Sequence, residues 1–198
     1  MSLTTSTTTV NPAIRTVNGE NLPVAGTYAL DSSHSEVGFA VRHLMVSKVR
    51  GRFSDVAGTI EIGESPLESS VAVTIQTASI DTRDEQRDGH LRSDDFFGVE
   101  SYPTMTYVSR SVRAAGKGRY VVEGDLTIKG VSQPVPLELT FEGGGADPWG
   151  GVRIGFSAKA ELDREAYGLT WNQALETGGV VVGKKVAIEI EAEAVKQN

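Results

Sequence analysis

The segment DTRDEQRDGHLRSDDFF, residues 81–97, holds the side chains of this sequence that are best suited to chemistry. Asp88 and His90 are candidates for a general base or for metal ligands, and His34 and His43 lie on an earlier segment that the fold could bring near them. The spacing supports neither role, because no two histidines are four residues apart and the chain has no cysteine. Motifs of zinc proteases, serine hydrolases, dinucleotide sites and phosphate loops are also absent. We therefore predict no catalytic residue, no metal site and no cofactor.

Most of the remaining chain has the pattern of strands that would hold this segment in place. From residue 27 onward, apolar and polar residues alternate with a period of two, as in strands with one buried face. In KVAIEIEAEAV, residues 185–195, Val186, Ile188 and Ile190 fall on one face, and the lysine and glutamates fall on the other. Such strands have one dry face and one wet face.

Turn-forming stretches such as GESPLE, AAGKG and GGGADPWGG separate about eight strands. Two stretches interrupt this pattern with helical or irregular sequence, residues 81–101 and residues 163–179. Strands and helices do not alternate, which favours an antiparallel meander, and closing the meander into a barrel removes its exposed edges. We predict an all-β fold, an elongated eight-stranded antiparallel barrel with a short helical insertion near 81–101.

Charge and composition exclude several functional classes. The formal net charge is −7 and the pI is near 5.0, which opposes binding to the phosphates of nucleic acids. The lack of cysteine excludes disulfides, thiolate nucleophiles and sulfur-ligated metals. The longest apolar runs, such as GGVVVG at 178–183, fall far short of the roughly 20 residues that a membrane-spanning helix needs. We expect no nucleic-acid partner and no membrane span.

The expected strands are long for a barrel of this width. We interpret LESSVAVTIQTASI, residues 67–80, as one strand of about 13 residues, which at roughly 3.3 Å per residue is about 43 Å long. The interior of such a barrel is either filled by side chains or a narrow tunnel. A tunnel of this form suits a linear apolar molecule better than a compact metabolite.

We name residues 81–97 the capping segment, because we expect it to lie across one mouth of the barrel. Its backbone groups would have no strand partner there, and Asp, Arg and His side chains can supply the missing donors and acceptors. On this interpretation His90 is a structural hydrogen-bonding group. Leu91, Phe96 and Phe97 then turn inward at the mouth. The alternative is that the two phenylalanines only fill the core.

The first residues of the chain are rich in Thr, Ser and Asn and show no sustained period. We expect residues 1–24 to be a polar leader that rests on the body or on a neighbouring chain, and residues 25–198 to be a single barrel domain. The start of the sequence has neither a basic stretch nor an apolar segment of signal-peptide length. We therefore expect a cytoplasmic protein, or a periplasmic or secreted one if a signal has been removed.

Four stretches together resemble the YceI-like family of polyisoprenoid-binding proteins, in family order over about residues 26–195. They are YALDSSHSEVGFAVRHLMVSKVRGRF, SIDTRDEQRDGHLRSDDFFGVESYPTMTYVS, GDLTIKGVSQPV and ELDREAYGLTWN. The resemblance implies an elongated, lipocalin-like antiparallel barrel, a homodimer, and a tunnel that holds a long isoprenoid chain.

The expected function is therefore non-enzymatic binding, transport or storage of a long-chain isoprenoid lipid, such as a polyprenyl quinone or polyprenyl phosphate. His43 would end an apolar inner row and bond either the capping segment or a polar head of the ligand, and Trp171 would anchor the core beside the tunnel. The expected ligand-binding residues are Val37, Phe39, Val41, His43, Phe53, Val73, Ile75, Leu91, Phe96, Phe97, Leu126, Leu139, Phe156, Trp171 and Ile188.

Two alternatives from other functional classes stay open at this point. One is a lipid-modifying enzyme that uses a cluster of His34, His43, Asp88 and His90, which would have to converge on an open cavity. The other is a packed interaction module that holds no ligand and has no tunnel.

Overall fold

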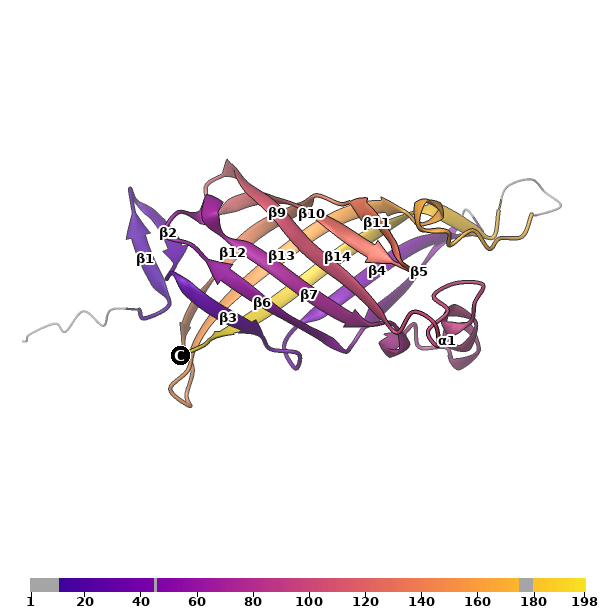
Figure 1. Cartoon of the computed structure of the whole chain (residues 1–198), viewed down its shortest axis with the longest axis horizontal. Coiled ribbons are helices and arrows are strands. Elements are labelled where there is room, and N and C mark those ends of the chain that lie inside the picture. Colours follow the sequence, from indigo (N-terminus) through magenta and orange to yellow (C-terminus); the bar gives the residue numbers. More distant parts are fainter. Residues whose placement is uncertain (1–10, 45, 175–179) are drawn as a thin grey trace, which may run out of the picture.

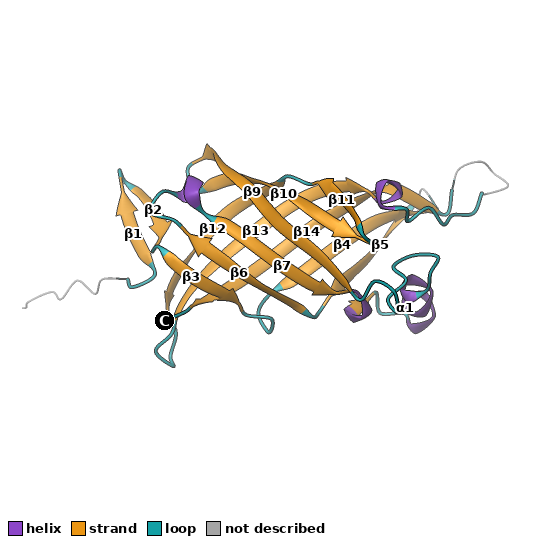
Figure 2. Ribbon diagram, in the orientation of Figure 1, coloured by secondary structure: helices purple, strands orange, loops and turns teal. Residues whose placement is uncertain are grey.

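The computed structural model of the chain describes residues 11–44, 46–174 and 180–198. Within these ranges the regular structure is almost wholly β, with one short α-helix and three 3-10 turns (Figure 2). The strands are β1 (Ile14–Val17), β2 (Glu20–Pro23), β3 (Gly26–Leu30), β4 (Glu36–His43), β5 (Ser47–Phe53), β6 (Val56–Ile62), β7 (Ser70–Gln76), β8 (Ile80–Asp81), β9 (Thr104–Gly116), β10 (Arg119–Ile128), β11 (Val131–Pro134), β12 (Leu137–Ala146), β13 (Val152–Asp163) and β14 (Val182–Lys196). The helical elements are α1 (Glu85–Arg92), η1 (Pro66–Glu68), η2 (Thr77–Ser79) and η3 (Arg164–Tyr167). No helix within the described ranges is long and apolar enough to cross a bilayer.

Eight strands close into an antiparallel barrel, which confirms the predicted fold class. Around the ring the neighbours are β3, β6, β7, β9, β10, β12, β13 and β14, and β14 pairs in turn with β3. The barrel is drawn out along one axis, with β1 and β2 at one end and α1 at the other (Figure 1). Apart from the join between β14 and β3, the order follows the chain, as the period-two pattern and short turns predict.

Three of the eight strand paths consist of two strands joined end to end. β4 continues β3 along β14, β5 leads into β6, and β8 continues β7. The prediction of one strand over 67–80 is therefore wrong. Its start is the turn η1, where the Ser65 hydroxyl accepts a hydrogen bond from Leu67 N, and its end is broken by η2, where Thr77 donates to Tyr102 O at 2.8 Å. The length of the barrel comes instead from β9 and β14, of 13 and 15 residues.

One strand changes its inward face halfway along its length. In β9, Tyr107 and Val112 both line the interior although they are five positions apart, an odd offset that would put them on opposite faces of a regular strand. Ser109 and Ser111 pair with consecutive residues of β10, so Arg110 is an extra, unpaired residue. Such a bulge shifts the alternation by one residue. The change of inward face therefore comes from one extra residue, Arg110, and the strand itself continues past it.

The second half of the leader forms a hairpin that rests on the chain's own barrel. β1 and β2 pair antiparallel, and Ala13 just before them is fully buried. Arg15 donates to Gly63 O at 2.8 Å, and Glu20 accepts a hydrogen bond from Gly118 N at 2.8 Å. The contact with the body is thus made through a short strand pair that polar composition did not predict. The first ten residues lie outside the described part of the chain.

The capping segment contains the predicted helical insertion as α1. The helix begins after Asp84, whose side chain accepts a hydrogen bond from Arg87 N at 3.0 Å, and it ends at Arg92, just before Ser93. The second predicted insertion contains η3 and then Gly168, which takes the left-handed conformation that ends this turn. Its residues 175–179 lie outside the described part.

Candidate functional site

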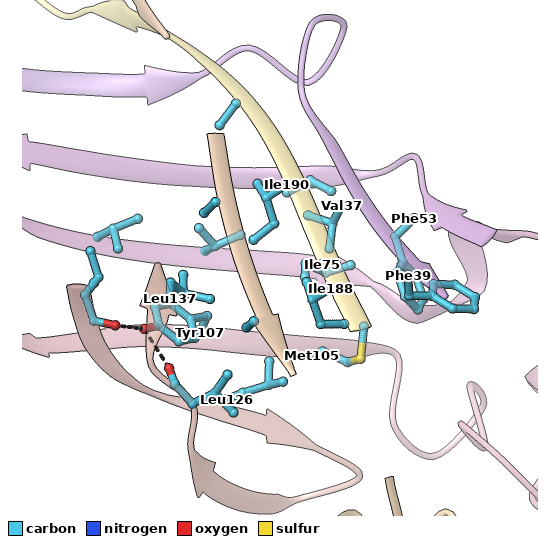
Figure 3. Close-up of a pocket in the computed structure, with 18 of the residues that line it drawn as sticks. Val37, Phe39, Phe53, Ile75, Met105, Tyr107, Leu126, Leu137, Ile188 and Ile190 are labelled. Atoms are coloured by element: carbon cyan, nitrogen blue, oxygen red, sulfur yellow. Dashed lines mark hydrogen bonds between the residues drawn. The ribbon is translucent and has the colours of Figure 1, made fainter. Parts of the chain in front are cut away.

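An apolar cavity of about 280 Å³ lies inside the barrel. Its wall includes Pro23 of β2 at one end and Leu91 of α1 at the other, so the cavity follows the long axis of the molecule. Figure 3 shows Val37, Ile75 and Ile188, from three different strands, pointing toward the same space. Nearly all of the wall surface is apolar. A cavity of this shape and chemistry fits a linear apolar molecule.

The structure places most of the sequence-predicted ligand residues in this wall. Their side chains face inward because successive residues of a strand point to opposite faces. The wall contains, from the predicted set, Val37, Phe39, Val41, Phe53, Val73, Ile75, Leu91, Phe96, Phe97, Leu126, Leu139, Phe156 and Ile188. That these residues bind a ligand stays a prediction.

His43 is not part of the cavity wall, contrary to expectation. It is the last residue of β4, opposite Val182, and the inner row stops two residues earlier at Val41. The chain turns directly after it, because Leu44 adopts a φ of +49°. The alternation that predicted an inward histidine therefore ends where the strand ends.

Several wall residues escaped the sequence prediction. They include Met105, Tyr107, Leu137, Ala160, Leu162, Leu169 and Ile190. Leu137, Leu162 and Ile190 share the alternating faces of residues that were chosen, so the signal for them was present. Met105 and Tyr107 precede the bulge of β9, which obscured their face.

Tyr107 is a polar residue that contributes no free polar group to the cavity. Its hydroxyl lies within hydrogen-bonding distance of Val122 O at 3.0 Å and of Val135 O at 3.1 Å (Figure 3). Burial raises the pKa of the Tyr107 hydroxyl far above its ordinary value. The residue therefore stays neutral and behaves as part of the apolar wall.

Arg164 is a charged wall residue at the α1 end of the cavity, and no sequence signal identified it. It is 3% exposed, and it donates to the backbone oxygens of Gly183 at 2.9 Å, Trp171 at 3.0 Å and Val182 at 3.3 Å, and also to that of Leu169. Burial lowers the pKa of its guanidinium. Among the described residues, no carboxylate lies within ion-pair distance of it. The group fixes the segment after β13 to β14 and brings a positive charge to this end.

The residues of the enzyme alternative are not brought together. His34 precedes β4 and His43 ends it, and the seven steps from Glu36 to His43 span about 23 Å at roughly 3.3 Å per residue. Asp88 and His90 belong to α1, and neither is a residue of the cavity wall. The four side chains therefore do not converge on one point of the cavity in this arrangement.

A separate ionic cluster joins the ends of several strands. Asp31, His34 and Glu193 place possible ligand atoms within 4.8 Å of one another. Arg153 already occupies their centre, with Nη1 at 2.5 Å from Asp31 and from Glu193 and Nε at 2.9 Å from Asp147. Its hydrogen bonds hold the pKa of Asp31 well below the ordinary value and also lower that of Asp147. The absence of a bound metal stays a prediction, which elemental analysis of purified protein tests.

Asp88, and not His90, is the buried ionisable side chain of the capping segment. Asp88 is 6% exposed and accepts hydrogen bonds from Thr82 N at 3.0 Å and Thr82 Oγ1 at 2.5 Å. Arg87 also donates to the backbone oxygen of Thr82, at 2.8 Å. His90 Nε2 lies 3.0 Å from Asp95, but the His90 side chain is 38% exposed. Of the Asp, Arg and His side chains expected to hold the segment by hydrogen bonds, Asp88 is therefore the one whose bonds are shielded from water, whereas those of His90 are not.

The underside of the capping segment is aromatic. Phe96 and Phe97 line the cavity, and the Phe97 ring stands edge-on to Phe53 with 5.5 Å between centroids. Trp171 lies behind this layer and not in the wall, with its ring 4.6 Å from His90 and 5.5 Å from Phe96. These rings close the α1 end of the barrel with apolar surface.

Comparisons with known proteins agree with this geometry. The YceI-like domain family matches residues 28–194. A UPF0312 protein of Staphylococcus epidermidis is 41% identical over 168 residues, which cover 84% of this chain and 95% of that protein. A UPF0312 protein of Staphylococcus aureus is 41% identical over 169 residues, with the same coverage of both chains.

Solved structures share the architecture. The YCEI protein of Campylobacter jejuni superimposes with a TM-score of 0.68 at 31% identity, covering 85% of this chain and 97% of that one. BcnA of Burkholderia cenocepacia gives a TM-score of 0.73 at 24% identity, over 83% and 98% of the two chains. A polyisoprenoid binding domain from Saccharophagus degradans gives 0.66 at 17% identity, over 86% and 98%. The last two likenesses concern the fold alone.

Proposed function

The chain belongs to the YceI-like family, and on that premise we propose that its barrel binds one long-chain isoprenoid lipid as a non-enzymatic carrier or store. A polyprenyl quinone and a polyprenyl phosphate are the two ligand types that we consider. The name of one structural neighbour, a polyisoprenoid binding domain, supports this ligand class.

The axial cavity is the observation that carries the proposal. Its wall takes residues from strands all around the barrel and is apolar along its length. A ligand that buries on the order of 500 Å² of apolar surface gains roughly 12 kcal/mol before the costs of ordering are subtracted. Burial alone is therefore sufficient for tight binding of a long hydrocarbon chain.

Arg164 supports a polar head group at the α1 end of the cavity. Its positive charge is buried, and among the described residues it has backbone oxygens and no carboxylate as partners. A carbonyl or phosphate oxygen placed nearby would be attracted to this charge in a medium of low dielectric constant. The apolar tail would then extend along the barrel toward β2.

Native mass spectrometry of freshly purified protein tests the proposal. We expect a species heavier than the 21.1 kDa chain, whose excess mass on release is that of an isoprenoid lipid. Ala158→Trp should abolish this species, because Ala158 is buried in the wall and an indole there fills the cavity. Lys159→Trp is the matched control, because the next residue of β13 points outward. Protein that never carries lipid, in cells that contain such lipids, would disprove the carrier function.

The two alternative functions fit the structure less well. A packed interaction module has no internal cavity, and this barrel has one. A lipid-modifying enzyme needs acid and base groups at the cavity; the described wall includes Glu36, Glu191 and Arg164 but none of the expected cluster of His34, His43, Asp88 and His90. We therefore propose that no cofactor and no chemical step are involved. The cytoplasmic location remains part of the proposal, and cell fractionation tests it.

A further inference from the structure

The turn between β4 and β5 exposes aliphatic side chains at the α1 end of the barrel. Leu44 is 39% exposed and Val46 is 80% exposed. His43 beside them pairs with Val182, the first residue of β14, and Asn172 binds the same Val182 from the segment after η3. The turn therefore projects next to the end of the barrel that the capping segment closes (Figure 1).

The outer face of the same hairpin is cationic. Residues 37–54 contain four Arg or Lys and no Asp or Glu, in a chain whose net charge is −7. Arg42 and Lys48 are direct cross-strand partners, and Arg50 follows on the same face. Like charges directly opposite each other destabilise a strand pair. The arrangement is thus costly to the isolated protein, and an anionic partner would remove that cost.

These cations differ from the other basic residues around them. Arg52 contacts Glu36 and Asp81, whereas Lys184 and Lys185 on the neighbouring strand each have a glutamate at 2.6 to 2.7 Å. Among the described residues, Arg42, Lys48 and Arg50 have no carboxylate within ion-pair distance, as is also true of some basic side chains elsewhere, such as Lys117 and Lys159. The hairpin therefore places three cations without a carboxylate partner on two neighbouring strands.

The inner face of the hairpin belongs to the cavity. Val41 and Phe39 of β4 line the wall, and so does Phe53 of β5. A surface that engages the outer face and the tip of this hairpin would therefore lie against the same strands that enclose the cavity. The exposed aliphatic tip calls for an apolar partner, and the cations on the outer face call for an anionic one. A partner with an anionic surface and an apolar interior meets both conditions.

We propose that the β4–β5 hairpin docks on a bilayer that contains anionic lipids. Leu44 and Val46 enter the boundary between head groups and acyl chains, while Arg42, Lys48 and Arg50 contact lipid phosphates. The net charge of −7 repels the rest of the molecule from the same surface, so docking is oriented through the hairpin. The proposal concerns a surface outside the cavity and is testable whether or not the cavity holds a lipid.

Vesicle sedimentation tests the role of the cations. Wild-type protein should bind vesicles of phosphatidylcholine with about 30% phosphatidylglycerol, bind pure phosphatidylcholine much less, and dissociate between about 0.1 M and about 0.5 M salt. Arg42→Gln combined with Lys48→Gln should weaken binding about 25-fold, at about fivefold per cation. Lys117→Gln combined with Lys159→Gln removes equal charge from exposed positions elsewhere and should leave binding unchanged. Equal loss in both double variants would overturn the proposal.

A second pair of variants tests the insertion of the tip. Leu44→Ser with Val46→Ser should weaken vesicle binding several-fold, while Leu67→Ser with Val108→Ser, at sites 52% and 53% exposed, should not. Circular dichroism checks that all variants are folded. The bilayer proposal is wrong if the Leu44→Ser, Val46→Ser variant binds anionic vesicles like wild type and heparin displaces the protein fully from those vesicles. The hairpin would then be a general surface for polyanions. Binding to neutral and anionic vesicles alike would also contradict the bilayer proposal.

Discussion

At the scale of single residues, Asp88 and His90 show how burial decides the cost of losing a polar side chain. Asp88 is buried and accepts two hydrogen bonds from Thr82, whereas His90 is open to solvent and its partner Asp95 is more exposed still. Water can replace the partner of an exposed group but not that of a buried one. The two side chains, two positions apart, should therefore differ strongly in their contribution to stability.

Asp88→Ala should lower the free energy of unfolding by about 2 kcal/mol, because it leaves the Thr82 amide and hydroxyl unpaired inside the protein. His90→Ala should cost about 1 kcal/mol, chiefly through its lost edge-on contact with Trp171. Urea unfolding of the two variants under identical conditions measures both values. A larger loss for His90→Ala than for Asp88→Ala would contradict this account.

Arg153 makes the free energy of unfolding depend on pH in the acid range. Its hydrogen bonds lower the pKa of Asp31 and Asp147 from the ordinary value of 3.8, so the folded state holds these carboxylates ionised more strongly than the unfolded state does. The stabilisation is complete above about pH 4 and is lost as the pH falls through the folded-state pKa values. We expect the free energy of unfolding to decrease as the pH is lowered below about 4.

Arg153→Gln should reduce stability at pH 6 and flatten the profile below pH 4, because the two aspartates then titrate closer to their unfolded values. Arg110→Gln, which removes an exposed pair with Asp125, is the matched control and should leave the slope unchanged. Chemical unfolding at a series of pH values provides the measurement. Parallel profiles for wild type and Arg153→Gln would refute this account.

At the scale of elements, the capping segment combines two layers. One is a polar clamp, the hydrogen bonds between Asp88 and Thr82, and the other is an aromatic underside, the rings of Phe96 and Phe97. The clamp holds α1 in place through Thr82 and Asp88, and the rings of Phe96 and Phe97 face the cavity. The two layers have separable roles, because the first fixes the position of the segment and the second contacts whatever fills the barrel. The hairpin β4–β5 lies beside it and contributes Phe53 to the same aromatic layer.

Phe96→Ala combined with Phe97→Ala should speed the release of a bound lipid roughly tenfold, since the lost apolar contact weakens retention by about 1.4 kcal/mol. His90→Ala should change the release rate much less. Transfer of a fluorescent polyprenyl lipid to acceptor vesicles measures both rates, with circular dichroism confirming that the variants are folded. If the histidine variant releases lipid faster than the double phenylalanine variant, the aromatic layer is not what closes the barrel.

At the scale of the whole molecule, the leader hairpin bears on the oligomeric state. β1 and β2 rest on the barrel of their own chain, so they do not require a neighbouring chain as support. The expectation of a homodimer then rests on the family alone. Light scattering at micromolar concentration should give about twice the chain mass of 21.1 kDa, and a mass of one chain would contradict it.

The amino-acid sequence by itself determined the fold class and most of the cavity wall. Alternation with a period of two puts every second side chain on one face, and a closed barrel has only one inside, so the apolar face of each strand must line it. Val37, Ile75 and Ile188 could therefore be placed in one wall although they are far apart in the chain. The resemblance of four sequence stretches then identified the family.

Only the tertiary structure decided where this alternation stops or changes face. The bulge at Arg110 exists because of its pairing with β10, and η2 breaks a strand path through a hydrogen bond from Thr77 to a residue 25 positions away. Burial of Asp88 and Arg164 likewise depends on which backbone groups the fold brings around them. Such features are set by contacts between distant segments, which a local pattern of residues does not encode.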